Sequence, residues 1–287
     1  MQPRKKILVT GSNGQLGSEI GVLANRYPQF EFLATSREQL PITNEGAVND
    51  FFEKHRPDFC INCAAYTAVD KAEDTAEFDN VSAVNKDAVS HLAKACARHN
   101  ARLVHISTDY VFDGTATEPY KETDATNPVS VYGTTKREGE IAAMAQTDAI
   151  IIRTAWVYAP FGNNFVKTIM RLMKERPQIS VVSDQYGTPT YAADLAQAIL
   201  AIIASGNWKP GIYHYSNKGK INWYEFALAI KEIIKSDCEV KAIPTLQYPT
   251  PAKRPAWSVL DKTKIQEAFG LEIPEWKDSL KACIHRM

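Results

Sequence analysis

The sequence predicts an α/β fold, a Rossmann-type doubly wound parallel sheet with a smaller C-terminal substrate-binding lobe. Short apolar runs alternate with amphipathic stretches through the first half of the 287 residues, as in parallel sheets that helices cover on both faces. A glycine-rich turn follows the first of these runs and opens a helix. Hydrophobic residues make up 45% and charged residues 23% of the chain, so a substantial buried core is expected.

The first half of the chain is expected to supply most of the main sheet. Ile7-Leu8-Val9 and Ile150-Ile151-Ile152 are apolar without alternation, which indicates strands that are buried on both faces. Strands are predicted at residues 5–10, 30–34, 59–62, 102–107 and 149–154, and helices from about residue 15 and at 44–55, 79–99 and 131–145.

The second half is less regular and is expected to build the smaller lobe. Four prolines between residues 244 and 255 predict an extended loop. Residues 1–158 are assigned to a dinucleotide-binding domain and residues 159–287 mainly to the substrate-binding lobe. Strands near 179–183 and 211–215 are candidates to return to the main sheet. Helices are predicted at residues 164–176, 192–204, 222–236, 261–269 and 275–285.

Charge and targeting signals limit the classes of partner. Lys and Arg together total 33, as do Asp and Glu, so the formal net charge is zero. A neutral chain has no general attraction to nucleic acid or acidic membranes, and neither is expected as a partner. The first apolar run is too short for a signal sequence, and no stretch approaches the length of a membrane span. We therefore expect a cytoplasmic protein.

Cysteine and histidine patterns predict neither disulfides nor a metal. The five cysteines are odd in number and scattered, which suits reduced thiols. Cys60 and Cys63 have the spacing of a redox pair, but they fall on a predicted strand, where residues three apart point to opposite faces. The six histidines show no metal-ligand spacing.

The glycine-rich turn is the first candidate site. Its glycines follow a strand and open a helix, the context in which such spacing indicates dinucleotide binding. Glycine allows a tight turn and a close approach of the backbone to a pyrophosphate, whose charge then lies at a helix N-terminus. The cofactor-binding residues expected here are Gly11, Asn13, Gly14, Gln15, Leu16 and Gly17.

The end of the second predicted strand bears on the choice of cofactor. A carboxylate about 20 residues beyond the glycines would bind the ribose 2′-OH and favour NAD. Here Thr35-Ser36-Arg37 precedes the first carboxylate, Glu38. Arg37 can pair with a 2′-phosphate and Ser36 can donate to it, so NADPH is predicted. The alternative is that Arg37 stacks on adenine in an enzyme that also accepts NADH.

Tyr132 and Lys136 form a Y-x-x-x-K pattern on a predicted helix, where four-residue spacing places both side chains on one face. A free phenol titrates near pH ~10, and a neighbouring ammonium is expected to lower that pKa so that the phenol can exchange protons. Thr108 ends the fourth predicted strand, at the sheet edge where such folds bind ligands. Its hydroxyl is a candidate to hold a substrate carbonyl beside Tyr132, and capping of the strand end is the alternative.

The G-x-x-G-x-x-G spacing resembles that of the extended branch of the short-chain dehydrogenase/reductase family, which also keeps its Tyr–Lys pair after the fourth β–α unit. Within this branch, the chain resembles the dTDP-4-dehydrorhamnose reductase family over essentially its whole length. Single motifs are weak, but their order and joint presence are specific. The segments that carry the resemblance are residues 14–17, 62–73, 107–114, 127–128, 131–133, 153–158, 162–165, 184–190 and 248–255.

The resemblance implies hydride transfer from NADPH to the C4 ketone of dTDP-4-dehydro-L-rhamnose, giving dTDP-L-rhamnose. Tyr132 would protonate the developing alkoxide, Lys136 would tune it and Thr108 would orient the ketone. Asn85 resembles the family's fourth catalytic residue, with a structural amide as the alternative. Further implied contacts are Ala64, Ala65 and Tyr66 on the nicotinamide side, Arg254 on the diphosphate, and Val69, Asp109, Tyr110, Trp156 and Asn163 on the sugar or nucleotide. Trp156 and Arg254 as packing and surface residues are the alternatives.

Departures from the family pattern leave three questions open. Some relatives bind Mg²⁺ through glutamates at a dimer contact; Glu19 matches one of these, but Ala193 stands where another is expected. No required metal is therefore predicted, and a homodimer stays open. One alternative function is a nucleotide-sugar epimerase or dehydratase, although Asp109 and Tyr110 follow Thr108 in place of the Asp-Glu pair of dehydratases. The other is a non-catalytic NADP-binding regulator that resembles the beta subunit of methionine adenosyltransferase.

Overall fold

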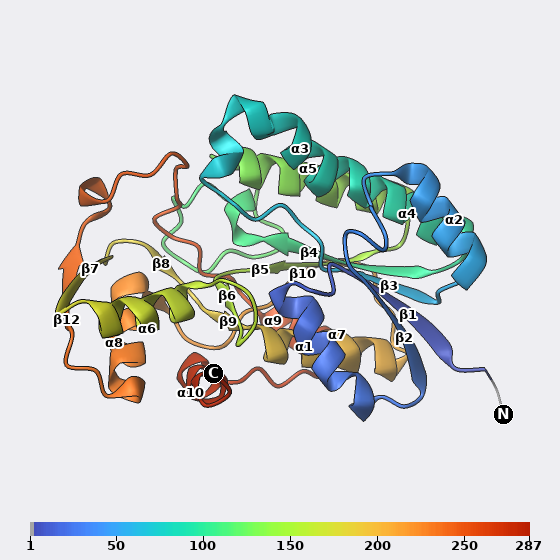
Figure 1. Cartoon of the computed structure of the whole chain (residues 1–287). Coiled ribbons are helices and arrows are strands. Elements are labelled where there is room, and N and C mark those ends of the chain that lie inside the picture. Colours follow the sequence, from blue (N-terminus) through green and yellow to red (C-terminus); the bar gives the residue numbers. More distant parts are fainter. Residues whose placement is uncertain (1–2) are drawn as a thin grey trace.

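The computed structural model describes residues 3–287 and has a main sheet of six strands (Figure 1). These strands are β1 (Lys5–Thr10), β2 (Phe30–Thr35), β3 (Phe59–Asn62), β4 (Arg102–Thr108), β5 (Ile150–Thr154) and β10 (Gly211–His214). All neighbours run parallel, in the order β10-β5-β4-β3-β1-β2. The order of winding reverses between β1 and β3, and the crevice at such a switch point is where open α/β sheets bind ligands.

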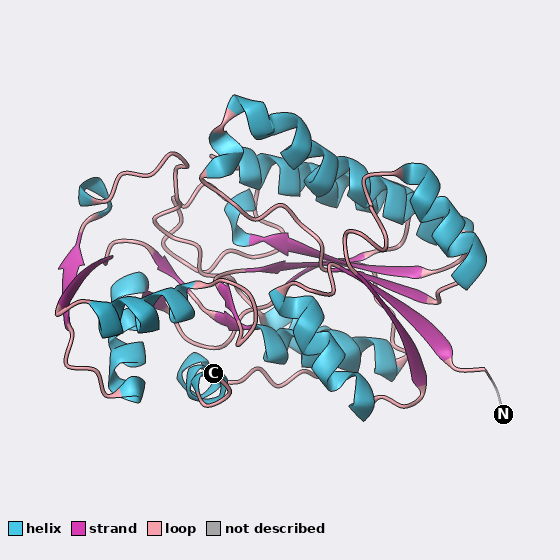
Figure 2. Ribbon diagram, in the orientation of Figure 1, coloured by secondary structure: helices cyan, strands magenta, loops and turns pink. Residues whose placement is uncertain are grey.

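Helices cover both faces of this sheet, which confirms the predicted doubly wound fold (Figure 2). They are α1 (Gln15–Leu23), α2 (Glu45–His55), α4 (Ala88–Arg98), α5 (Val131–Gln146), α7 (Ala192–Ser205) and α9 (Thr263–Phe269). Leu8 and Cys60 pack on one face with α2, α4 and α5, whereas Ile7 and Val9 pack on the other with α1, α7 and α9. Adjacent residues of β1 thus enter opposite cores, which explains its unbroken apolar run.

The helix predicted at residues 79–99 is continuous but contains a π-helical turn. It runs from α3 (Phe78–Ser82) through the turn at Ala83–Asp87 into α4. Such turns are frequent at functional sites, and Asn85 lies buried in this one. α5 passes very close to it, because a Cβ added at Gly139 would lie 2.2 Å from the carbonyl oxygen of Asn85.

The smaller lobe forms around α6 (Phe165–Glu175), α8 (Trp223–Ile234) and α10 (Trp276–Ile284), which share one apolar cluster. Its strands pair two by two: β6 (Val157–Tyr158) with β9 (Thr190–Tyr191), β8 (Tyr186–Gly187) with β11 (Ile221–Asn222), and β7 (Gln178–Val182) with β12 (Glu239–Ile243).

The two strands predicted as candidates to return to the main sheet behave differently. The strand predicted at 211–215 does return, as β10 beside β5. The expectation for residues 179–183 is wrong, because β7 pairs with β12 far from the main sheet (Figure 1). Ile179 and Val181 are buried while Ser180 is exposed, as in a sheet with one solvated face. The division at residue 158 stays a prediction, but α7, which follows it, packs on α1 and covers the main sheet.

Candidate functional site

The glycine-rich turn between β1 and α1 depends on close backbone contacts. Gly11 has φ = +64°, and a Cβ there would lie 2.8 Å from the backbone of Ala64. A Cβ at Gly17 would lie 2.5 Å from the carbonyl oxygen of Gly11. Gly14, the N-cap of α1, has no side chain to satisfy the first N–H groups of the helix. The turn is therefore a backbone cradle that suits a phosphate.

A pocket of about 450 Å³ opens beside this turn. It is lined by six of the residues predicted to bind the cofactor: Gly11, Ser36, Arg37, Ala64, Ala65 and Tyr66. Sequence reasoning missed an apolar wall made by Leu40, Ile42 and Val84. The signal for part of it was present, since Leu40 and Ile42 follow directly after the Ser36-Arg37 segment. A pocket that combines an apolar wall with the end of the glycine-rich turn suits a ligand with a flat apolar part and an anionic part.

Ser36 and Arg37, which are predicted to bind the cofactor, are both part of the pocket lining. Arg37 is exposed. The Ser36 hydroxyl donates to the Glu38 carboxylate at 2.6 Å, and this hydrogen bond lowers the pKa of Glu38. The hydroxyl predicted to donate to a phosphate is thus bonded to a neighbouring carboxylate, and the pocket lining also holds Lys71 and Glu77.

Tyr132 lies in the first turn of α5, beside the carboxyl end of β4. Its ring meets that of Tyr110 edge-on, with centroids 5.7 Å apart. Burial raises the pKa of Tyr132 to about 12, and the nearby Thr108 hydroxyl partly offsets this effect. α5 comes this close because Gly133 has no side chain: a Cβ there would lie 2.2 Å from the carbonyl oxygen of Tyr110. Three predicted residues, Thr108, Tyr110 and Tyr132, thus form one cluster.

Asp109 continues this cluster into the interior. Its Oδ1 accepts from Thr108 Oγ1 at 3.0 Å, whereas its buried Oδ2 has no partner within residues 3–287. Burial raises the pKa of Asp109 to about 6, although the hydrogen bond from the Thr108 hydroxyl acts in the opposite direction. A buried carboxyl with a free oxygen beside a tyrosine is a functional-site feature.

Lys136 follows Tyr132 by one turn of α5 and is buried. Its Nζ donates to the carbonyl of Ile106 at 2.6 Å and lies 3.5 Å from His105 Nε2. Burial lowers the pKa of Lys136 to about 8. The expected lowering of the Tyr132 pKa by Lys136 is not what the structure shows, because burial of the phenol raises that pKa. The phenol therefore keeps its proton at neutral pH.

Asn85 joins the loop after β3 to α5. Its Oδ1 accepts from the Tyr66 N–H at 2.9 Å, and its Nδ2 donates to the Tyr66 carbonyl at 3.1 Å and to Thr135 Oγ1 at 3.3 Å. These bonds fix the backbone of the pocket wall against the helix that bears Tyr132. They favour the structural-amide alternative for Asn85.

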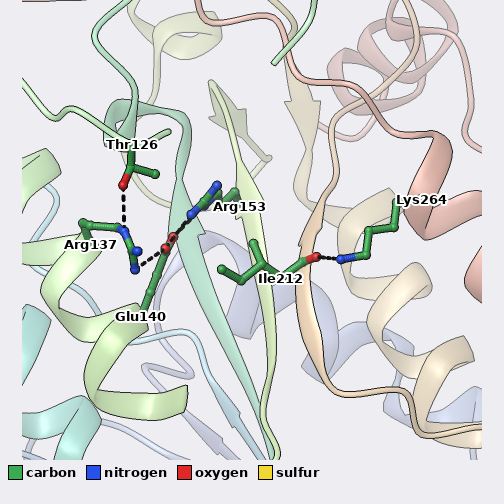
Figure 3. Close-up of polar contacts among 6 residues, drawn as sticks. All are labelled: Thr126, Arg137, Glu140, Arg153, Ile212 and Lys264. Carbon is green, nitrogen blue, oxygen red and sulfur yellow. Dashed lines mark hydrogen bonds and ion pairs between the residues drawn. The ribbon is translucent and has the colours of Figure 1, made fainter. Parts of the chain in front are cut away.

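A buried ion pair holds α5 on the sheet (Figure 3). Arg153 of β5 donates from Nε and Nη2 to the two carboxylate oxygens of Glu140, both at 2.8 Å. Arg137 reaches the same carboxylate at 3.4 Å. On the other side of the same view, Lys264 of α9 donates to the Ile212 carbonyl of β10 at 2.7 Å. Because removing one partner of a buried pair is costly, the pair fixes the face of α5 that carries Tyr132 and Lys136.

Arg254 lies in the proline-rich loop and is not free. Its Nη1 and Nη2 donate to the two carboxylate oxygens of Asp70 at 2.9 and 2.7 Å. These hydrogen bonds lower the pKa of Asp70. The charge of Arg254 also acts on Tyr110, against the effect of burial, which raises the pKa of that phenol. The predicted diphosphate residue thus stands at the edge of the Tyr132 cluster, paired with a carboxylate.

Two other predicted substrate residues lie on the lobe side. Trp156 has φ = +49° and stacks on Trp223 with centroids 3.5 Å apart. Asn163 is exposed on the loop before α6. Its neighbour Asn164, which sequence reasoning missed, donates to Gln15 Oε1 at 3.0 Å. Gln15, predicted to bind the cofactor, therefore ties the glycine-rich turn to the lobe.

The remaining predicted residues differ in exposure. Val69 is half-buried and Asn13 is exposed on the glycine-rich turn. The side chain of Leu16 packs in the core below the sheet, so any contact with a cofactor there would come from its backbone.

Glu19, which the resemblance matches to a metal-binding glutamate of some relatives, is paired with an arginine in this structure. Glu19 is buried and accepts from Arg286 at 2.9 and 3.0 Å. Within residues 3–287, no cluster of three or more acidic, His or Cys side chains has the arrangement of a metal site. In the same part of the chain, all five cysteines are unpaired, and no helix combines the length and apolar composition needed to cross a bilayer.

Comparison with known proteins identifies the family of this chain. Residues 5–287 match the family model described as RmlD substrate binding domain. A dTDP-4-dehydrorhamnose reductase from Aggregatibacter actinomycetemcomitans is 43% identical, over 96% of this chain and 97% of the relative. A crystal structure of a dTDP-4-dehydrorhamnose reductase from Clostridium acetobutylicum matches with a TM-score of 0.93 and 44% identity, covering 98% of this chain and 99% of that one. A structure from Bacillus anthracis, solved in complex with NADP, matches with a TM-score of 0.95 and 36% identity, covering 99% and 100%.

Proposed function

Because this chain belongs to the RmlD substrate-binding family of dTDP-4-dehydrorhamnose reductases and is an NADP-dependent oxidoreductase, we propose that it reduces the C4 ketone of dTDP-4-dehydro-L-rhamnose with Tyr132 as general acid. The product is dTDP-L-rhamnose. The observation that carries the role of Tyr132 is its burial at the end of β4, in one cluster with Thr108.

The backbone cradle and the pocket beside it fit a dinucleotide. Side chains at Gly11 or Gly17 would collide with backbone atoms, so this turn requires glycine, and its position at a helix N-terminus suits a pyrophosphate. Arg37 in the pocket lining supplies the positive charge that a 2′-phosphate needs. When bound, the reduced nicotinamide supplies the hydride that adds to the ketone carbon.

Tyr132 has the protonation state that a general acid needs before the reaction. Its pKa is raised to about 12, so the phenol carries its proton throughout the neutral range. Negative charge that develops on the substrate oxygen takes this proton, while Thr108 orients the same oxygen by hydrogen bonding. Lys136, whose pKa is lowered to about 8, is a suitable source of a proton for the resulting phenolate.

The diphosphate of the substrate is assigned to Arg254. A planar guanidinium suits bidentate contact with phosphate oxygens. Asp70 and the Ala252 carbonyl hold this guanidinium in a fixed orientation, and its Nε–H and the second N–H of Nη2 are available for a ligand.

The function is tested by following NADPH absorbance while a coupled dehydratase and epimerase generate the 4-keto sugar. We expect oxidation of NADPH that depends on the sugar, with dTDP-L-rhamnose as product by mass spectrometry and NMR. Binding of NADPH without any turnover would instead support the regulatory function. Formation of an epimerised or dehydrated sugar without net oxidation of NADPH would support the epimerase or dehydratase alternative.

A further inference from the structure

A chain of buried polar groups runs from Lys136 of α5 into the strands of the main sheet beneath this helix. His105 of β4 is fully buried, with Lys136 Nζ 3.5 Å from its Nε2 and Asn62 Nδ2 3.1 Å from its Nδ1. Asn62 of β3 is buried as well, and its Oδ1 lies 2.7 Å from Thr10 Oγ1 and 3.2 Å from the Ala64 nitrogen. Neither His105 nor Asn62 has a part in the function proposed above.

The backbone of Ala64 determines which way the Asn62 amide points. A backbone N–H can only donate, so the atom facing it at 3.2 Å must be the amide oxygen of Asn62. The NH₂ group of Asn62 therefore faces His105 Nδ1. Because an amide NH₂ also only donates, Nδ1 must accept, and the proton of the neutral imidazole is on Nε2.

This tautomer directs a donor at Lys136. The His105 Nε2–H faces Nζ at 3.5 Å, and an ammonium offers no lone pair to accept it, whereas a neutral amine does. The other groups around Nζ are the Ile106 carbonyl, which accepts at 2.6 Å, and the Glu140 charge, which favours the ammonium. Glu140 is itself paired with Arg153.

We propose that His105 is a positioning residue which, held in the Nε2–H tautomer by Asn62, stabilises the amine form of Lys136. The effect of His105 on catalysis, unlike the tautomer itself, rests on the proposed function. The substrate oxygen takes the phenol proton of Tyr132, the phenolate takes one proton from the Lys136 ammonium, and the amine that remains regains a proton from solvent. His105 keeps its own proton throughout and makes the amine easier to form.

The pKa values agree in direction with this arrangement. Burial lowers the pKa of His105 well below its usual value, and the Lys136 charge lowers it further. His105 is therefore neutral at physiological pH, as the tautomer argument requires. Lys136 titrates near 8, close enough to neutrality for both of its forms to be populated.

The tautomer is tested without turnover by ¹⁵N NMR of histidine-labelled full-length protein, with His105→Gln to assign the signal. We expect an unprotonated Nδ1 and a protonated Nε2 between about pH 6 and pH 8. An imidazolium, or a proton on Nδ1, would overturn the proposal. Because this measurement needs neither substrate nor cofactor, its result is separate from success or failure of the proposed function.

Asn62→Asp tests the consequence for Lys136. A carboxylate at this position can still accept from Ala64 and Thr10, but it also accepts from His105 Nδ1, so the imidazole turns its Nε2 lone pair toward the ammonium. With ¹³Cε-labelled lysine, assigned through Lys136→Arg, we expect the Lys136 titration midpoint to rise by about one pH unit or more. The pH at which kcat declines on the alkaline side should increase by the same amount, because the ammonium is the proton donor.

His105→Gln is the second variant, since its amide oxygen can face the ammonium directly, and it should move the Lys136 midpoint in the same direction. His55→Gln is the matched control, because His55 is on α2 and stacks on Phe51. Folded Asn62→Asp and His105→Gln proteins with unchanged Lys136 titration would contradict the proposal. If the variants shift the Lys136 titration but the wild-type protein shows no reductase activity, the role of His105 is supported and the proposed function is refuted.

Discussion

Arg254 and Asp70 are 184 residues apart in sequence, yet the guanidinium donates to both carboxylate oxygens at 2.9 and 2.7 Å. The pair ties the proline-rich loop to the loop after β3, and Asp70 Oδ1 also accepts from the Ala252 N–H at 3.2 Å. Two segments whose charges both act on Tyr110, which packs on Tyr132, are thus joined by one ion pair. This contact holds the loop, and its arginine, beside the Tyr132 cluster.

Arg254→Ala should weaken binding of the dTDP-sugar far more than binding of NADPH. Loss of charge-assisted hydrogen bonds to a diphosphate should raise the sugar KM roughly 10- to 100-fold. Arg254→Lys should recover only part of this, since an ammonium lacks the bidentate fork. Steady-state kinetics with each substrate varied checks both variants. An equal rise in the KM of NADPH would mean that the substitution disturbs the fold of the loop instead.

Arg37→Ala should reduce the preference for NADPH over NADH. Arg37 is a cation in the pocket lining, next to Ser36, and in the proposed function its loss removes a contact to the 2′-phosphate that NADH never makes. The KM for NADPH should rise roughly tenfold or more, with little change for NADH. Arg26→Ala, an exposed arginine outside the pocket, is the control for a change in net charge. If NADH suffers as much as NADPH, Arg37 stacks on adenine and does not read the phosphate.

Asp109→Asn should change the pH dependence of stability. The pKa of Asp109 is about 6 in the folded protein against an ordinary 3.8, so the folded state binds the proton more tightly. Stability from this group is present below about pH 4 and is lost as pH rises through 6. The variant should therefore gain stability relative to wild type between about pH 4 and pH 7, by on the order of 3 kcal/mol. Urea unfolding at pH 4 and pH 7 measures the free energy of unfolding of the variant relative to wild type. An equal difference at the two pH values would contradict the prediction.

Gly139→Ala and Gly21→Ala should have opposite effects on thermal stability. A Cβ at Gly139 would lie 2.2 Å from the Asn85 carbonyl oxygen, whereas nothing lies within 4 Å of one at Gly21. The first change should cost about 1–3 kcal/mol through overpacking, and the second should add about 0.5–1 kcal/mol because alanine favours helix. Melting temperatures under identical conditions compare the pair. Equal shifts would show that helix propensity alone decides both.

The main sheet could be predicted because its strands are unambiguous in sequence. β1 and β3 have the predicted bounds. The segments Ile7-Leu8-Val9 and Phe59-Cys60-Ile61 are apolar at every position and signal these two strands clearly. The expectation that residues 179–183 are a candidate for the main sheet is wrong, although Ser180 between two buried apolar residues marks a strand with one solvated face. Its partner β12 is mostly exposed and has no apolar run to signal it.

The site was predicted where one short segment carries the chemistry, as in the glycine-rich turn and the helix of Tyr132 and Lys136. Contacts between distant strands were not predictable in this way. His105 and Asn62 look like ordinary polar residues in apolar strands, and only the order β4-β3-β1 brings them together behind Lys136. The sign of the Tyr132 pKa shift was wrong for a similar reason, because burial by Tyr110 and its surroundings is a property of the fold.

The central claim is that Tyr132 gives its proton to the substrate, and Tyr132→Phe tests it most directly. The phenyl ring keeps the packing against Tyr110 but has no proton to give. We predict that NADPH oxidation with the 4-keto sugar slows by ~10²-fold or more, as expected for loss of a general acid, while NADPH binding by fluorescence titration stays within about twofold of wild type. Near-normal turnover by a correctly folded Tyr132→Phe enzyme would contradict the account.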